Sequence, residues 1–199
     1  MVDKLNTING YILAGGESSR MGSDKGLMLF NGKSIIQYCI EQIKPLVNNL
    51  IIVSNNPEYE KFGFEVVADL IKDIGPAGGI YTALDHSKAD FNYIVSCDMP
   101  FITKDALEFL FQQKEFSQIV LPVWNGKIEP LVGVYSKECL AKWLELIHQG
   151  TIKLQEMFLH FNLKKINVEK NVLFGDSFFL NINTKNDLEN AFNVLKNGN

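Results

Sequence analysis

Continuous apolar runs of strand length alternate along the chain with stretches whose apolar residues recur at helical spacing. The runs at 11–14, 50–53 and 93–96 predict buried strands. Apolar residues recur every three or four positions over 35–47 and 103–111, which predicts helices with one buried face. Apolar strands that alternate with amphipathic helices are typical of a parallel sheet covered on both faces. We therefore predict an α/β fold of three layers, with helices on both sides of a mostly parallel sheet.

Two asparagine–glycine pairs predict hairpins. The pair at 31–32 follows a short apolar run, and the pair at 125–126 should join extended segments at 118–124 and 127–135. Asn-Gly suits the two positive φ angles that a two-residue hairpin turn requires.

Two capping boxes predict where helices begin. Ser34 is followed three positions later by Gln37, and Thr184 by Asp187. In this spacing the hydroxyl and the second side chain satisfy the free N–H groups of a first helical turn. The run at 178–184 leads us to expect a last strand, and the second box predicts a terminal helix after it.

Composition limits the class of protein and its partners. The chain has 199 residues, of which 46% are apolar and 21% charged, with a formal net charge of −4. This balance indicates a globular protein and argues against a nucleic-acid-binding surface. We see no linker, membrane-spanning run or signal peptide, and therefore expect one domain over 1–199, no membrane partner and a cytoplasmic location. The three separated cysteines favour free thiols over disulfides or a zinc site.

The segment that follows the first strand carries the strongest chemical signal. Residues 13–26 read LAGGESSRMGSDKG. Gly15 and Gly16 allow a sharp turn with accessible N–H groups, and Arg20 and Lys25 add two cations. Amide donors and fixed positive charge suit a polyphosphate. The spacing fits neither a P-loop nor the Gly-x-Gly-x-x-Gly fingerprint, so a nucleotide would be held by another kind of loop.

A second signal lies at the end of the strand at 93–96. Asp98 and Pro100 follow it directly, which fixes one carboxylate at the carboxyl edge of the sheet. Mg²⁺ in phosphoryl chemistry favours one or two such carboxylates together with water and phosphate oxygens. Asp98 is therefore the candidate metal ligand. Cys97 has no credible histidine partner, and we interpret it as an inert neighbour.

Polar residues and glycines follow two other predicted strands. Asn55 and Asn56 come at the end of the strand at 50–53, where open α/β sheets bind ligands. Either asparagine, or simply a turn that ends at a proline, fits this position. Asp69 follows a weaker strand, and Gly78-Gly79 would allow close approach of a base or ribose at the start of an expected helix.

These motifs together resemble the nucleotidyltransferases that transfer a nucleoside monophosphate from a triphosphate. Within them the molybdenum cofactor guanylyltransferase family is the most similar. The matching residues are Leu13-Ala14-Gly15-Gly16, Arg20-Met21-Gly22, Asp24-Lys25, 75–79, 97–100 and 181–184. The resemblance implies a Rossmann-like fold of the nucleotide-diphospho-sugar transferase type.

The same resemblance implies a reaction and its partners. GMP would pass from GTP to the terminal phosphate of molybdopterin or Mo-molybdopterin, with Mg²⁺ as cofactor and pyrophosphate as product. Proteins that deliver the molybdenum cofactor are further candidate partners. By the resemblance, the catalytic residues are Arg20, Lys25 and Asp98, and Asp98 holds the metal. The nucleotide-binding residues are Leu13, Ala14, Gly15, Gly16, Lys25, Asp69, Gly78 and Asp98, with Asn55 and Asn183 as further candidates.

Alternatives stay open at this point. Gly15-Gly16 and Asp24-Lys25 favour a guanylyl enzyme, because cytidylyl relatives tend to have Ala-Gly and Pro-Lys there. A molybdopterin cytidylyltransferase, another small-molecule nucleotidyltransferase and a nucleotide-binding module without turnover are the alternatives. For Asn183, a role in capping the last helix is equally compatible with the pattern.

Overall fold

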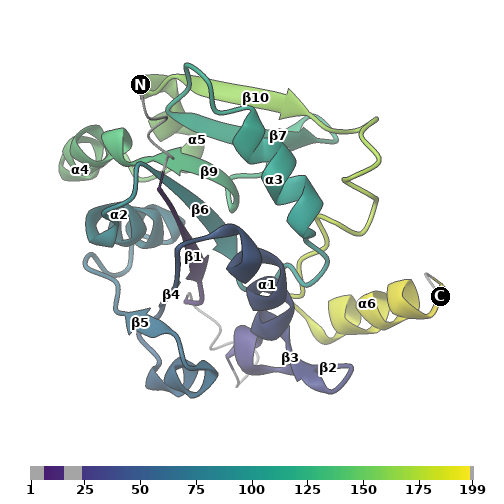
Figure 1. Cartoon of the computed structure of the whole chain (residues 1–199). Coiled ribbons are helices and arrows are strands. Elements are labelled where there is room, and N and C mark those ends of the chain that lie inside the picture. The colour runs from purple at the N-terminus through teal and green to yellow at the C-terminus, as the bar shows by residue number, and fades with distance from the viewer. Residues whose placement is uncertain (1–6, 16–23, 198–199) are drawn as a thin grey trace.

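The computed structural model describes residues 7–15 and 24–197 (Figure 1). The candidates Gly16 and Arg20 lie outside this range, so their roles stay predictions from the sequence. Among the described residues, no helix has the length and apolar character needed to cross a membrane.

An eight-stranded sheet forms the centre of the fold, in the order β10-β7-β9-β6-β1-β4-β5, with β8 paired to β7. Neighbours β1, β4, β5 and β6 are parallel, as are β7 and β10, whereas β9 lies between β6 and β7 and is antiparallel to both. The strands are β1 (Ile8–Leu13), β4 (Asn49–Val53), β5 (Glu65–Val67), β6 (Phe91–Ser96), β7 (Ile119–Trp124), β8 (Lys127–Ile128), β9 (Val132–Ser136) and β10 (Leu163–Asn167).

Helices cover both faces of this sheet, which confirms the predicted three layers (Figure 1). On one face lie α1 (Ile35–Ile43) and α3 (Lys104–Gln112), and on the other α2 (Pro76–His86), α4 (Leu140–His148) and the short α5 (Leu154–Met157). Strand β1 is buried on both sides, with Ile12 in one hydrophobic cluster and Tyr11 in the other. This explains why the central strands are continuously apolar instead of alternating.

A row of asparagines crosses three strands at the amino end of the sheet. Asn49 of β4 and Asn92 of β6 are both in register with Asn9 of β1. Asn49 Nδ2 donates a hydrogen bond to Asn9 Oδ1 at 3.1 Å, and Asn92 Nδ2 donates to the Tyr135 carbonyl at 3.3 Å. Asn9 and Asn92 are buried and Asn49 is exposed, so these amides form a polar strip that runs from the interior of the sheet to its surface.

Both expected hairpins are present. Strands β2 (Leu29–Phe30) and β3 (Lys33–Ser34) are joined by Asn31 and Gly32, which have φ angles of 48° and 82°. The second turn, at 125–126, also has two positive φ angles and joins β7 to β8. The segment expected at 127–135 is not one strand, however. It divides into β8 and β9, because β9 leaves the hairpin to pair with β6 as well as β7.

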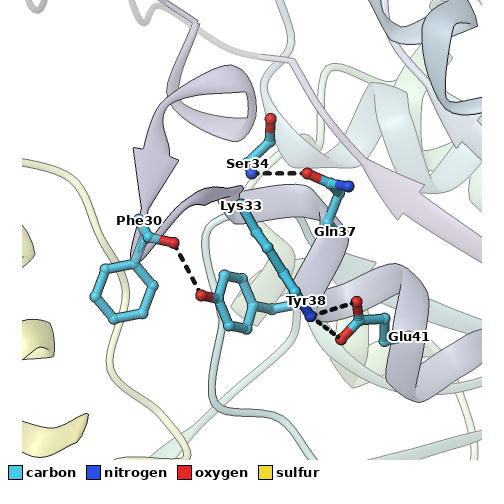
Figure 2. A network of polar contacts seen from close by, with 6 residues as sticks. All are labelled: Phe30, Lys33, Ser34, Gln37, Tyr38 and Glu41. Carbon is cyan, nitrogen blue, oxygen red and sulfur yellow. Dashed lines mark hydrogen bonds and ion pairs between the residues drawn. The ribbon is translucent and has the colours of Figure 1, made fainter.

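The first hairpin is fixed to α1 by a network of polar contacts (Figure 2). Ser34 N donates to Gln37 Oε1 at 2.8 Å, which confirms this half of the capping box. Tyr38 Oη donates to the Phe30 carbonyl at 2.8 Å, and Lys33 pairs with Glu41 at 2.6 Å. The ion pair is exposed to solvent, so it adds little to stability. The backbone contacts therefore matter more for joining the hairpin to the helix.

The expected last strand at 178–184 is wrong. The segment runs through turns, with Phe178 N bonded to the Gly175 carbonyl at 2.9 Å and Leu180 N to the Ser177 carbonyl at 3.0 Å. Strand β10 takes the edge position beside β7 instead. Phe178 and Ile182 are apolar because they fill hydrophobic clusters, and not because they belong to the sheet.

The second capping box is confirmed at the start of α6 (Lys185–Asn197). Asp187 N donates to Thr184 Oγ1 at 3.1 Å, and Thr184 N donates to Asp187 Oδ2 at 2.7 Å. A separate cluster that includes Phe30 and Ala191 joins this helix to the β2–β3 region (Figure 1). The last helix therefore packs beside the hairpin that follows Lys25.

Candidate active site

A cavity of about 620 Å³ opens at the carboxyl ends of four neighbouring strands. Its wall includes Leu13 at the end of β1, Val53 at the end of β4 and Ser96 at the end of β6. Gly15, Asn55 and Asp69 also line it, so four of the candidate nucleotide-binding residues meet here. This edge of an open parallel sheet is where such folds bind ligands.

Asn55 and Asp69 form a reciprocal pair on the cavity wall. Asn55 Nδ2 donates to Asp69 Oδ2 at 3.1 Å, and Asp69 N donates to Asn55 Oδ1 at 3.2 Å. Burial raises the pKa of Asp69, while the hydrogen bond from Asn55 and the Lys72 ammonium oppose that rise. Of the two candidate asparagines, Asn55 lines the cavity, whereas Asn56 contacts Asp24.

Lys25 lies on a short 3-10 turn, Lys25–Leu27, ahead of the β2–β3 hairpin. Its Nζ donates a hydrogen bond to Asn183 Oδ1 at 2.7 Å. The backbone N–H of Asn183 donates to Asp187 Oδ2 at 2.9 Å. The backbone of Asn183 therefore helps to cap α6, as one interpretation of the sequence expected, and its side chain contacts the candidate catalytic lysine. Its role in nucleotide binding stays a prediction.

Asp98 follows β6 and is tied to the same C-terminal segment. Ile182 N donates to the Asp98 carbonyl at 2.9 Å. Among the described residues, no group hydrogen-bonds to the buried Asp98 Oδ1. Burial raises the pKa of Asp98, and the Ser96 hydroxyl and the Lys25 ammonium oppose it. A buried carboxylate oxygen without a partner is costly, and a bound cation would remove that cost.

The residues around Asp98 fit one kind of metal site. Within residues 7–15 and 24–197, no group of three or more His, Cys, Asp or Glu side chains could hold an ion. Among these residues, an ion at Asp98 Oδ1 would find at most one further ligand of these kinds, so water and phosphate oxygens would supply the others. Mg²⁺ binds in this way, whereas zinc needs several protein ligands.

Two other candidates are explained by packing. A Cβ on Gly78 would lie 2.5 Å from the Ile71 carbonyl oxygen, so this position needs glycine to let α2 approach the preceding loop. Gly79 lines the cavity, but Gly78 is not among the lining residues. The helix begins at Pro76, two residues before the Gly78-Gly79 pair that was expected at its start. Ala14 is buried, and its N–H continues the sheet by bonding to the Val53 carbonyl at 2.8 Å.

Sequence reasoning missed several residues that line or support the site. Lys72 and Asp73 lie on the loop before α2 and line the cavity. The feature of the sequence that could have indicated them is a pair of charged residues in a loop that follows a strand. Tyr59 is fully buried and its hydroxyl donates to Asp24 Oδ1, a contact that no local pattern indicates.

The fold and the site define the class of protein: it is a nucleotidyltransferase with the fold of the nucleotide-diphospho-sugar transferases. The chain belongs to the MobA-like NTP transferase family, whose profile matches residues 10–163.

Curated relatives agree with this assignment. A protein of Flavobacterium johnsoniae named probable molybdenum cofactor guanylyltransferase is 36% identical over 192 residues, covering 96% of this chain and 98% of the relative. A protein of Natranaerobius thermophilus with the same name is 33% identical, covering 96% and 97%.

Solved structures agree as well. The molybdopterin-guanine dinucleotide biosynthesis protein A of Archaeoglobus fulgidus superposes with a TM-score of 0.80 at 27% identity, covering 95% of this chain and 99% of that one. The 2-C-methyl-D-erythritol 4-phosphate cytidylyltransferase of Thermus thermophilus has a TM-score of 0.70 at 12% identity, covering 96% and 99%. The second likeness concerns the fold alone.

Proposed function

We propose that this chain transfers GMP from GTP to the terminal phosphate of molybdopterin, with or without bound molybdenum, and releases pyrophosphate. The names of the relatives support the substrates. The observation that carries the proposal is the meeting of Lys25, Asn183 and Asp98 at the sheet edge that also bears the cavity.

The chemistry needs alignment more than proton transfer. An oxygen of the acceptor phosphate attacks the α-phosphorus of GTP, the bond from that phosphorus to the β-phosphate oxygen breaks, and pyrophosphate leaves with the electron pair. The attacking oxygen is already anionic, so no general base is required. Catalysis then depends on positioning and on fixed positive charge near the phosphates.

Lys25 supplies that charge. Its ammonium would offset the triphosphate and the departing pyrophosphate, and Asn183 Oδ1, 2.7 Å away, orients it. Arg20 is a second cation in the same role, predicted from the sequence only. Asp98 Oδ1 would hold Mg²⁺, which when bound supplies charge neutralisation at the phosphates.

The nucleoside would occupy the cavity. Its volume of about 620 Å³ falls within the usual range for small-molecule sites. Asn55 and Asp69 present amide and carboxylate groups on its wall, and Lys72 and Asp73 add charges of both signs. Guanine offers both donors and acceptors, so a wall with both kinds of group suits it.

We also propose that residues 1–199 form one catalytic domain and that the protein works in the cytoplasm. The three cysteines support a reducing compartment, since Cys39, Cys97 and Cys139 are free and buried.

Two linked measurements test the proposal. Thermal shifts with GTP, CTP and UTP, each with and without Mg²⁺, should show the largest stabilisation with GTP and Mg²⁺. Pyrophosphate release should then require authentic molybdopterin. A preference for CTP would transfer the assignment to cytidylyl transfer, and GTP binding without pyrophosphate release would contradict the proposed reaction.

A further inference from the structure

Asp24, the residue before Lys25, has both carboxylate oxygens occupied by hydrogen bonds. Oδ1 accepts from the Tyr59 hydroxyl and from Gly26 N, the latter at 3.3 Å. Oδ2 accepts from Asn56 Nδ2 at 3.2 Å. Three donors from two segments of the chain therefore hold one carboxylate at the start of the turn that carries Lys25.

The donors are themselves fixed. Asn56 Oδ1 accepts from Glu58 N at 3.0 Å, which turns the Asn56 amide nitrogen toward Asp24. Tyr59 is fully buried, and burial above all raises the pKa of its phenol, so the hydroxyl stays protonated and donates. A Cβ on Gly26 would clash with Tyr59 Oη and lie 3.1 Å from Cys97 Sγ. The turn is thus packed directly against Tyr59.

This arrangement limits an electrostatic difficulty, because donors that face the carboxylate reduce its competition for the lysine. An anion next to Lys25 would repel a triphosphate and compete with it for the ammonium. Because Tyr59, Asn56 and Gly26 satisfy the carboxylate, Lys25 Nζ extends instead to Asn183. Two neighbouring residues after β4 contact different carboxylates. Asn55 contacts Asp69 in the cavity, and Asn56 contacts Asp24.

We propose that Asp24 is a positioning residue, held by Tyr59 and Asn56, that fixes the turn so that the Lys25 ammonium lies at the triphosphate. The inference rests on the proposed role of Lys25 in nucleotidyl transfer. By this inference, Asp24, Tyr59 and Asn56 influence the rate of transfer without touching the nucleotide or the acceptor.

A reciprocal exchange tests the contact itself. In Asp24→Asn, an amide nitrogen replaces Oδ2 and faces the Asn56 amide, which places two donors together. In Asn56→Asp, two carboxylates face each other. In Asp24→Asn/Asn56→Asp, donor and acceptor are exchanged and the contact is restored. We expect each single variant to lower kcat/KM for GTP by about 10-fold to 100-fold, as for a small misplacement of a charged group. The double variant should regain most of this loss.

A double-mutant cycle tests whether Asp24 acts through Lys25. Adding Asp24→Asn to Lys25→Ala should lower GTP affinity and residual transfer less than twofold further, because the group being positioned is already absent. A full 10-fold further loss would show that Asp24 acts independently of Lys25 and would overturn the inference.

Matched tyrosine variants separate positioning from stability. Tyr59→Phe removes the hydroxyl that bonds to Asp24, whereas Tyr38→Phe removes one that bonds to the Phe30 carbonyl (Figure 2). Both should lower Tm, but only Tyr59→Phe should lower kcat/KM by about 10-fold at a temperature where all variants are folded. Equal activity of the two variants, or single exchange variants with normal turnover, would refute the positioning role. Absence of GMP transfer by the unmodified chain would instead refute the proposed function, so the two failures are distinguishable.

Discussion

Replacing Asp98 with asparagine should make the protein without ligands more stable while it abolishes efficient transfer. Asp98 Oδ1 is buried, and no described residue donates a hydrogen bond to it. Asparagine has almost the same shape but carries no charge, so the substitution removes most of the cost of burying an unsatisfied ionised group. That cost is about 1–3 kcal/mol for an unsatisfied buried group, and more for a charged one.

The stability gained by Asp98→Asn should depend on pH, and the pKa of Asp98 determines in which direction. Burial raises this pKa in the folded state, so the unfolded carboxyl loses its proton at lower pH than the folded one. Ionisation therefore favours unfolding as pH rises from the unfolded pKa through the folded pKa. Asp98→Asn lacks this group and should show its largest advantage at pH 7–8, with a smaller one toward pH 4.

Urea denaturation at pH 5 and pH 8, without nucleotide or Mg²⁺, measures both effects. We expect a gain of about 1–2 kcal/mol at pH 8, which for a chain of this size corresponds to a Tm increase of roughly 2–8 °C. Pyrophosphate release should fall by about 100-fold or more, comparable to the loss of a preorganised charge stabiliser. GTP with Mg²⁺ should raise the Tm of the unmodified protein more than that of the variant. A variant that is less stable at pH 8, or one with normal turnover, would refute the reasoning.

Three further variants separate binding, catalysis and packing. Lys25→Ala should lower transfer by about 100-fold with little change in Tm, since the side chain is partly exposed and its described hydrogen bond is to an exposed asparagine; a normal rate would remove Lys25 from the mechanism. Asn55→Ala should raise the Kd for GTP by about 10-fold, because Asp69 loses the amide that orients it; titration calorimetry with unchanged affinity would contradict this. Gly78→Ala should lower the free energy of unfolding by about 1–3 kcal/mol, because its Cβ would lie 2.5 Å from the Ile71 carbonyl oxygen and the backbone must move to relieve this contact. An unchanged midpoint in urea denaturation would show that the loop can move without cost.

Features set by neighbouring residues were predictable from the sequence. The buried runs of β1, β4 and β6, the turn at Asn31-Gly32 and the capping box at Thr184 are specified within a few positions and are found as predicted. The strand expected at 178–184 failed because apolar residues at strand-like spacing can equally fill clusters between other elements.

In the candidate site, too, some residues could be predicted from local motifs, whereas their contacts depend on tertiary structure. Lys25, Asp69 and Asp98 could be proposed from motifs, and the structure brings Lys25 to Asn183 and Asp69 to Asn55. The different surroundings of Asn55 and Asn56 required the tertiary structure, since Asn55 bonds to Asp69 and Asn56 bonds to Asp24. The contact from Tyr59 to Asp24 spans 35 positions and depends on tertiary packing alone.

The asparagine strip at the amino end of the sheet has a consequence at the opposite end. Asn9, Asn49 and Asn92 are in register, and four residues further along their strands lie Leu13, Val53 and Ser96, which are in register and line the cavity. Sliding β1 or β6 by a single residue would turn its buried amide toward the opposite face of the sheet and separate it from its partners. The strip therefore marks a common register, and equal distances along the three strands from it place Leu13, Val53 and Ser96 side by side on the cavity wall.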